Sequence, residues 1–254
     1  MSGHSKWSTI KRQKKANDQK RGKLFTKLAH EIVVAVREGG EDPEYNFRLR
    51  LALDRARDAN MPKDNIQRAI DRGTGRSLDG KALEEGFYEG YGPEGIALMI
   101  HYLTDNKNRA VSEIRHVLST HGGNLGSDGC VSWMFSQKGY IAIDPGAMDP
   151  EEVALEAIDA GAEDVEIDEE GVEVYTAVED FKEVSDTLEG AGFEIDNAEL
   201  LWEPQTTKTL SEKDTMKVMR LVEALEDLLD VQDVYSNLDL QDEMIEKYES
   251  DQAA

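Results

Sequence analysis

Gly139-Tyr140-Ile141-Ala142-Ile143-Asp144 begins a segment, residues 139–204, whose apolar pattern indicates the class of fold. Its first apolar run reads as a strand, and the pattern after it predicts a helix over 150–160, strands over 163–167 and 172–177, a helix over 178–190 and a strand over 193–202. This βαββαβ order is that of a ferredoxin-like unit. The interval 139–204 holds 22 acidic residues and one lysine, so we expect an acidic module that phosphate repels.

The sequence on either side of this module predicts a second α+β unit, made of residues 77–138 and 205–240. Residues 96–100 (IALMI) read as a buried strand, and the apolar positions after Thr104–Asn108 predict a helix that ends at Gly122-Gly123. Alternation over 131–135 predicts another strand, and a helix and a strand follow after Leu210. The glycine-rich residues 74–95 are expected to be linker and turns. The acidic module would then interrupt this second unit.

Residues 28–76 predict a bundle of three short helices with nearly no net charge. The first helix should end at Gly39-Gly40, the second should be capped by Asp42 and opened by Pro43, and the third should run from Pro62 to Gly73. Nine basic and nine acidic residues balance in this interval. At the other end of the chain, the acidic tail 241–254 is expected to be frayed.

A basic arm, residues 1–27, precedes these helices. It contains nine lysines and arginines against the single acid Asp18, whereas the remaining sequence has 20 basic and 52 acidic residues within a net charge of −24. The cations are Lys6, Lys11, Arg12, Lys14, Lys15, Lys20, Arg21, Lys23 and Lys27. Lysine and arginine release counterions from phosphates, so this segregation predicts that the arm binds a polyanion. Trp7 could stack on a base or dock on its own bundle.

Two weaker features have alternative interpretations. Asn106, Lys107, Asn108 and Arg109 stand at a predicted helix N-terminus, where exposed amides favour an anion. A capped helix without any ligand explains the same residues. Similarly, a lysine-rich terminus can be a simple soluble tail, but here the basic run continues into a helix, which favours phosphate contact.

The sequence offers little evidence for catalysis or a cofactor. The five histidines and the single Cys130 show no spacing typical of a zinc site, and we find neither a nucleophile motif nor carboxylates isolated in an apolar pocket. We therefore expect no enzyme activity, no cofactor, no metal and no small-molecule substrate. No apolar run reaches membrane-span length, and with one cysteine we expect a cytoplasmic protein without membrane contact. The acidic excess fits either protein partners or adaptation to salt.

Several motifs together resemble the YebC family. They are Gly3-His4-Ser5-Lys6-Trp7, Met61-Pro62-Lys63-Asp64-Asn65-Ile66, Tyr88-Glu89-Gly90-Tyr91-Gly92-Pro93, Thr104-Asp105-Asn106-Lys107-Asn108-Arg109, Glu156–Asp164 and Val231-Gln232-Asp233-Val234-Tyr235. The resemblance covers the chain to about residue 240. It implies an N-terminal helical domain and two ferredoxin-like domains, one inserted in the other, in an open crescent. It brings no established catalytic residues.

The family resemblance implies a DNA-binding transcriptional regulator, which is the usual label of its members. A translation factor bound to the ribosome, relieving stalls at proline-rich stretches or activating translation, is the alternative that the family also implies. The charge pattern does not separate DNA from ribosomal RNA, although an arm without a base-reading element slightly favours RNA. Nucleic acid is the expected partner in both cases.

Overall fold

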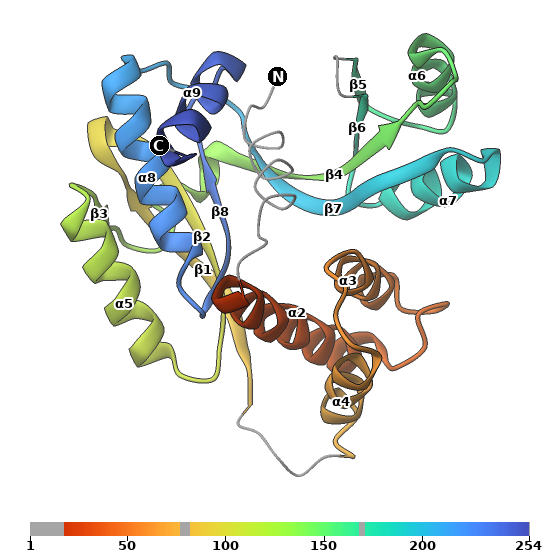
Figure 1. The fold of residues 1–254 in the computed structure, drawn as a ribbon, viewed down its shortest axis with the longest axis horizontal. Coiled ribbons are helices and arrows are strands. Elements are labelled where there is room, and N and C mark those ends of the chain that lie inside the picture. The colour runs from red at the N-terminus through yellow and green to blue at the C-terminus, as the bar shows by residue number, and fades with distance from the viewer. Residues whose placement is uncertain (1–17, 77–81, 168–170, 254) are drawn as a thin grey trace. The chain divides into compact units, whose positions relative to one another are not determined.

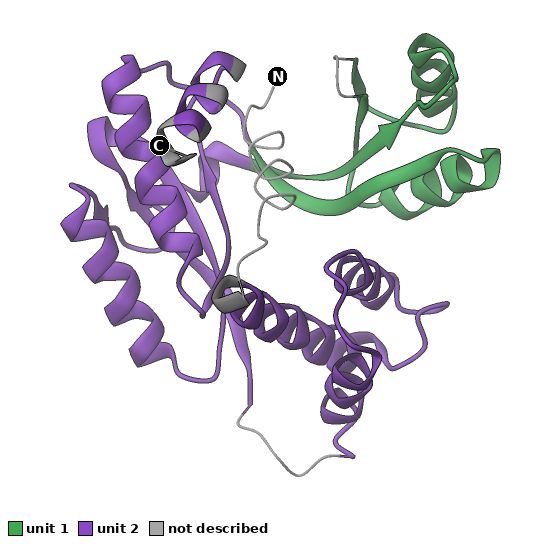
Figure 2. Cartoon of the chain, viewed as in Figure 1, with its two compact units in different colours: residues 1, 136–203 green, residues 2–135, 204–254 purple. Residues whose placement is uncertain are grey.

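The computed structural model describes residues 18–76, 82–167 and 171–253. The chain forms two compact units (Figure 2). Residues 136–203 make up the inserted unit, and the sequence on both sides of it makes up the larger unit. The predicted α+β fold class, with N-terminal helices and two separate sheets, is confirmed.

The inserted unit has the βαββαβ order that its sequence predicts (Figure 1). Its elements are β4 (Phe135–Asp144), α6 (Pro150–Asp159), β5 (Asp164–Ile167), β6 (Val172–Thr176), α7 (Phe181–Ala191) and β7 (Glu194–Pro204). The sheet order β5-β6-β4-β7 is the ferredoxin-like one. Ile141 and Val174 pair across antiparallel β4 and β6, and both are fully buried, as are Val153 of α6 and Leu188 of α7.

The larger unit contains the second four-stranded sheet, of order β3-β1-β2-β8. Its strands are β1 (Glu84–Tyr91), β2 (Ala97–Thr104), β3 (Asn124–Leu125) and β8 (Val231–Ser236). Helices α5 (Lys107–Thr120) and α8 (Glu212–Glu226) lie on the same side of it (Figure 1). Ile100, Ile114, Leu221 and Val234 belong to the one apolar cluster between helices and sheet.

Strand β1 corrects the expectation that residues 74–95 are linker and turns. The glycines of β1 interrupt the sequence pattern from which a strand would be predicted. Each glycine lies where another part of the chain comes close to the backbone. A Cβ on Gly86 would approach the Tyr102 hydroxyl to 2.8 Å, and one on Gly90 would approach the Asn124 carbonyl oxygen to 2.6 Å. The turn expected at the end of this interval is present, as the short 3₁₀ helix η1 (Pro93–Gly95) between β1 and β2.

The strand expected over residues 131–135 is also wrong. Residues Ser132–Met134 form a 3₁₀ turn, η2, and β4 starts only at Phe135. The cause is the buried Glu89 of β1, whose carboxylate accepts the backbone N–H groups of Gly129, Val131 and Ser132 at 2.7, 2.7 and 2.8 Å. These three bonds hold the chain in a loop where the alternation alone predicts an extended strand.

The helical region of the larger unit consists of α2 (Asp18–Gly39), α3 (Phe47–Asp58) and α4 (Lys63–Gly73). Helix α3 begins four residues later than the expected Asp42-Pro43 start. Asn46 is its cap: the side-chain oxygen accepts the Leu49 N–H at 3.0 Å, and the amide nitrogen donates to the carbonyls of Ala35 and Gly40. One buried side chain thus serves the end of α2 and the start of α3.

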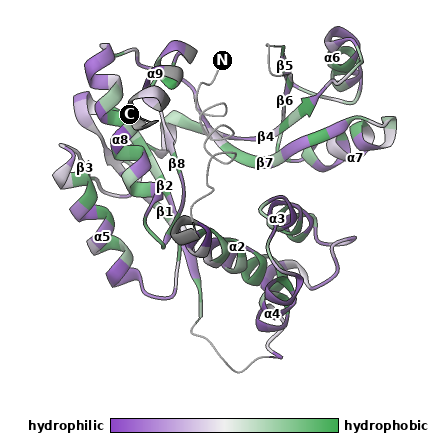
Figure 3. Cartoon of the chain, viewed as in Figure 1, coloured by the Kyte–Doolittle hydropathy of each residue, from purple (hydrophilic) through white to green (hydrophobic). Residues whose placement is uncertain are grey.

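The acidic tail is a helix, α9 (Asp242–Ala253), and is not frayed as expected. Ile245 and Tyr248 are 2% and 3% exposed within the apolar cluster that covers the sheet of the larger unit. The Tyr248 hydroxyl donates to Glu223 of α8 at 2.6 Å. Figure 3 shows hydrophobic and hydrophilic residues on the same helices, for example α5 and α8, as is typical of helices at a protein surface.

None of the helices within the described residues is long and apolar enough to cross a membrane.

We predict that Ile245→Ala lowers the free energy of unfolding of the larger unit by about 2–5 kcal/mol, the usual effect of truncating a buried aliphatic side chain. Urea unfolding followed by circular dichroism measures it. Glu243→Ala, on the exposed side of the same helix, is the control and should change little. Equal effects of the two substitutions would show that α9 does not pack as described.

Candidate nucleic-acid interface

The structure describes the predicted basic arm only from residue 18 onward, where α2 begins. Lys6, Trp7, Lys11, Arg12, Lys14 and Lys15 lie outside the described residues, so their assignment to nucleic-acid binding stays a prediction. Lys20 belongs to the first turn of α2. Arg21, one position further, is exposed, and its guanidinium carbon lies 5.5 Å from the centre of the Phe25 ring.

Lys23 and Lys27 face the C-terminal end of α8. The ammonium of Lys23 donates to the Asp227 carbonyl at 3.2 Å, and that of Lys27 donates to the Glu226 carbonyl at 2.6 Å. The last carbonyls of a helix lack partners within the helix and carry partial negative charge, which a cation neutralises.

Lys27 therefore has a structural role. It is 7% exposed, so in this conformation its ammonium serves α8 and does not face a nucleic acid. We remove Lys27 from the predicted phosphate contacts. Lys23 is exposed and stays among them, with a weaker bond to α8.

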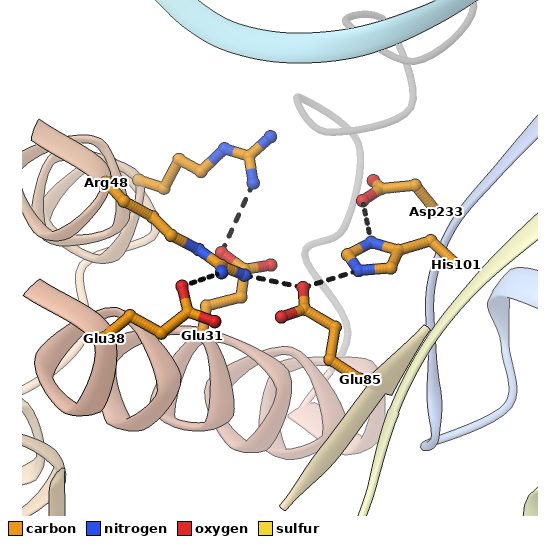
Figure 4. A network of polar contacts seen from close by, with 7 residues as sticks. Glu31, Glu38, Arg48, Glu85, His101 and Asp233 are labelled. Carbon is orange, nitrogen blue, oxygen red and sulfur yellow. Dashed lines mark hydrogen bonds and ion pairs between the residues drawn. The ribbon is translucent and has the colours of Figure 1, made fainter. Parts of the chain in front are cut away.

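A polar network, which the sequence pattern did not reveal, joins the helical region to the sheet of the larger unit (Figure 4). Arg48 of α3 reaches Glu38 of α2 with one guanidinium nitrogen and Glu85 of β1 with another, both at 2.6 Å. Glu85 lies 2.8 Å from Nε2 of His101, and Asp233 of β8 lies 3.5 Å from its Nδ1. We call Arg48, Glu85, His101 and Asp233 the junction network.

The junction network shifts the pKa values of its own members. Burial alone would lower the pKa of His101, but its hydrogen bonds to Asp233 and Glu85 and their charges outweigh burial and raise this pKa to about 9. Burial would raise the pKa of Glu85, but hydrogen bonds from His101 and Arg48 outweigh it and lower the value to about 2. Both shifts describe a protonated imidazole held between two carboxylates at neutral pH.

Three of the four residues of the weaker anion site, Asn106, Lys107 and Arg109, make contacts within the protein. Asn106 caps α5 by accepting the Arg109 N–H at 3.2 Å, and Lys107 pairs with Glu84 at 2.9 Å. The Arg109 guanidinium donates to both oxygens of the buried Asp230, at 2.9 and 2.7 Å, and to Asp105 at 2.8 Å. These carboxylates raise the pKa of Arg109 further. For Asn106, Lys107, Asn108 and Arg109, this geometry favours the capped helix over an anion site.

Other arginines of the helical region also have acidic partners. Arg55 pairs with Glu31 at 3.3 Å, Arg57 with Asp54 at 2.5 Å and Arg76 with Glu41 at 2.6 Å. The helical region therefore neutralises much of its own positive charge.

Within the part of the chain that the structure describes, no three His, Cys, Asp or Glu side chains gather in a way that could hold a metal ion.

Taken together, these features define a multidomain α+β protein that has, within the described residues, three N-terminal helices and two four-stranded sheets, and whose sequence begins with a basic segment. Residues 5–76 match the family model for the TACO1/YebC protein N-terminal domain, and residues 83–238 match the model for the TACO1/YebC second and third domain. The chain belongs to the TACO1/YebC family.

Relatives of the chain support this membership over the whole sequence. A probable transcriptional regulatory protein of Roseiflexus castenholzii is 54% identical over 98% of this chain and 100% of its own length. One from Chloroflexus aggregans is 53% identical with the same coverage. The crystal structure of a conserved hypothetical protein from Aquifex aeolicus is similar with a TM-score of 0.81 and 48% identity, covering 89% of this chain and 93% of that one.

The junction network generates a prediction about pH. The folded pKa of His101, about 9, lies above the ordinary 6.5, so its contribution to stability is complete below pH 6.5 and is lost as the pH rises to 9. His101→Gln should therefore cost most below pH 6.5, on the order of 2–3 kcal/mol, and progressively less up to pH 9. Glu85 stays ionised throughout this range.

Urea unfolding of the unmodified chain and of the His101→Gln variant between pH 5.5 and 9.5 measures how much stability the substitution costs at each pH. An NMR titration of the His101 ring gives its pKa directly. A midpoint near 6.5, with a pH-independent effect of the substitution, would contradict the network.

The position of Lys27 generates a second prediction. Lys27→Met keeps the apolar stem and removes the donor to α8, so we expect a loss of about 1.5–3 kcal/mol in the free energy of unfolding. The salt dependence of nucleic-acid binding should not change. A stable variant whose slope of log K against log salt falls by about 0.7–0.9 would return Lys27 to the phosphate contacts.

Proposed function

We propose that this protein regulates gene expression without catalysis, by binding the phosphate backbone of nucleic acid through its basic arm. The relatives named above are called probable transcriptional regulatory proteins, which supports the regulatory role. The proposed contacts are Lys6, Trp7, Lys11, Arg12, Lys14, Lys15, Lys20, Arg21 and Lys23. The proposed location is the cytoplasm, with no cofactor.

The single observation that carries this proposal is the placement of positive charge. Eight of the nine arm cations remain after Lys27 is assigned to α8. In the helical region behind them, Arg48, Arg55, Arg57 and Arg76 are in ion pairs with acids. A polyanion therefore meets its strongest attraction at the arm.

Binding of this kind follows phosphate more than base sequence. Backbone contacts position a protein on nucleic acid but carry little sequence information. Duplex DNA and ribosomal RNA thus remain the two candidate targets, corresponding to a transcriptional regulator and a ribosome-associated translation factor. Sequence-dependent affinity for DNA would support the first, and salt-sensitive co-sedimentation with ribosomes would support the second.

The arm is tested by replacing Lys11, Arg12, Lys14 and Lys15 with Ala and titrating duplex DNA and ribosomes at several salt concentrations. If about five arm cations contact phosphates, the slope of log K against log salt is roughly −3.5 to −4.5. The fourfold variant should reduce the magnitude of this slope by about 3, because each lost contact removes about 0.7–0.9.

The control carries the same loss of charge elsewhere: Lys182, Lys213, Lys217 and Lys247 replaced with Ala. These lysines lie on exposed surfaces outside the arm. We expect the control to bind like the unmodified protein. If the arm variant keeps full affinity, or if the control loses as much, the arm is not the binding site.

A further inference from the structure

The inserted unit exposes an unusual share of apolar side chains. Among the described residues, eight large hydrophobic side chains are exposed, and all but Tyr45 and Trp133 belong to this unit. They are Met148, Leu155, Ile158, Ile167, Val178 and Leu200. The unit spans 68 of the 254 residues, so its size does not explain the concentration.

Leu155 and Ile158 stand out within this group because they are neighbours on one helix. They are 63% and 55% exposed and lie three positions apart on α6, so they share one face. The buried residues Val153 and Ala157 mark the side of α6 that packs into the unit. At 3.6 residues per turn, Leu155 and Ile158 fall on the side of the helix opposite to these two.

The residues around this pair are acidic. Glu151, Glu152 and Asp159 are exposed on the same helix, and we call them, with Leu155 and Ile158, the outer α6 face. The inserted unit has only two lysines; Lys138 pairs with Glu163, and Lys182 pairs with Asp186 at 2.7 Å. The outer α6 face therefore combines apolar and strongly anionic character.

This combination selects the chemistry of a partner. Isolated exposed apolar residues are ordinary on protein surfaces, but adjacent ones on an outward helix face indicate a contact surface. Phosphate and anionic lipid would be repelled by the surrounding carboxylates. A second copy of the inserted unit would bring the same negative charge. A cationic segment with its own apolar side chains satisfies both the carboxylates and the two aliphatic side chains.

We propose that the outer α6 face binds a basic amphipathic helix of another protein. Leucine-like side chains of that helix would pack against Leu155 and Ile158, and its lysines or arginines would face Glu151, Glu152 and Asp159. Helix-on-helix contact of this kind needs apolar anchors at i and i+3 or i+4 on the partner. This site makes no use of the basic arm and goes beyond the nucleic-acid function.

The test uses the full chain and a fluorescent synthetic peptide of about 14 residues, or about four helical turns, with leucine and lysine in amphipathic spacing. Fluorescence anisotropy should show binding that weakens at least tenfold in the Leu155→Ser/Ile158→Ser variant. The matched control, Val178→Ser/Leu200→Ser, removes two other exposed apolar side chains of the same unit and should bind normally. Circular dichroism checks that both variants stay folded.

Three results would overturn the proposal. The first is equal peptide binding by the Leu155→Ser/Ile158→Ser variant and the unmodified chain. The second is equal binding of a peptide with serine in place of leucine, which would indicate charge attraction without a site. The third is a dimer in sedimentation analysis that this variant abolishes, which would make the face a self-interface. The arm variant should bind the peptide normally, so failure of this site and failure of the arm remain distinguishable.

Discussion

The larger unit depends on a charged junction between two separate apolar cores. Leu28, Ile32 and Leu49 belong to the core of the helical region, whereas Ile100 and Leu221 belong to the core on the sheet. Between them, the Lys27 ammonium binds the end of α8, and the junction network connects α3 to β1, β2 and β8. Lys27 is a buried charge, and losing the partner of a buried charge is costly, so this contact constrains how α2 meets α8. Helix α2, which continues from the basic arm, is held in place by these bonds.

Segregation of charge gives two separate parts of the sequence different chemical tasks. The arm gathers cations ahead of the first helix, and the inserted unit gathers 22 acids between residues 139 and 204. In our proposals, phosphate is attracted to the arm and repelled by the inserted unit, and the inserted unit in turn attracts a basic protein segment. One chain could then contact nucleic acid and protein together without the two partners competing for one surface.

Much of the fold could be predicted because apolar periodicity reports burial directly. The order of the inserted unit, the run 96–100 and the ends of α2 and α4 at glycines all follow from local pattern. What could not be predicted depends on contacts between distant residues. Strand β1 is hidden by Gly86 and Gly90, whose neighbours Tyr102 and Asn124 come close only in the folded sheet. Asn46 displaces Asp42 as a cap because it also serves α2, and His101 meets Asp233 across 132 positions of sequence. Lys27 has the same charge as the other arm cations, and only α8 distinguishes it.

In our proposal, nucleic acid binds at the arm, and the two folded units contribute little positive charge to the contact. The most direct measurement is the acylation rate of every lysine of the unmodified protein, followed by mass spectrometry with and without saturating DNA or ribosomes. We expect Lys6, Lys11, Lys14 and Lys15 to be protected, while Lys182, Lys213 and Lys217 react at unchanged rates. Protection of the latter three, with the arm lysines still reactive, would contradict it.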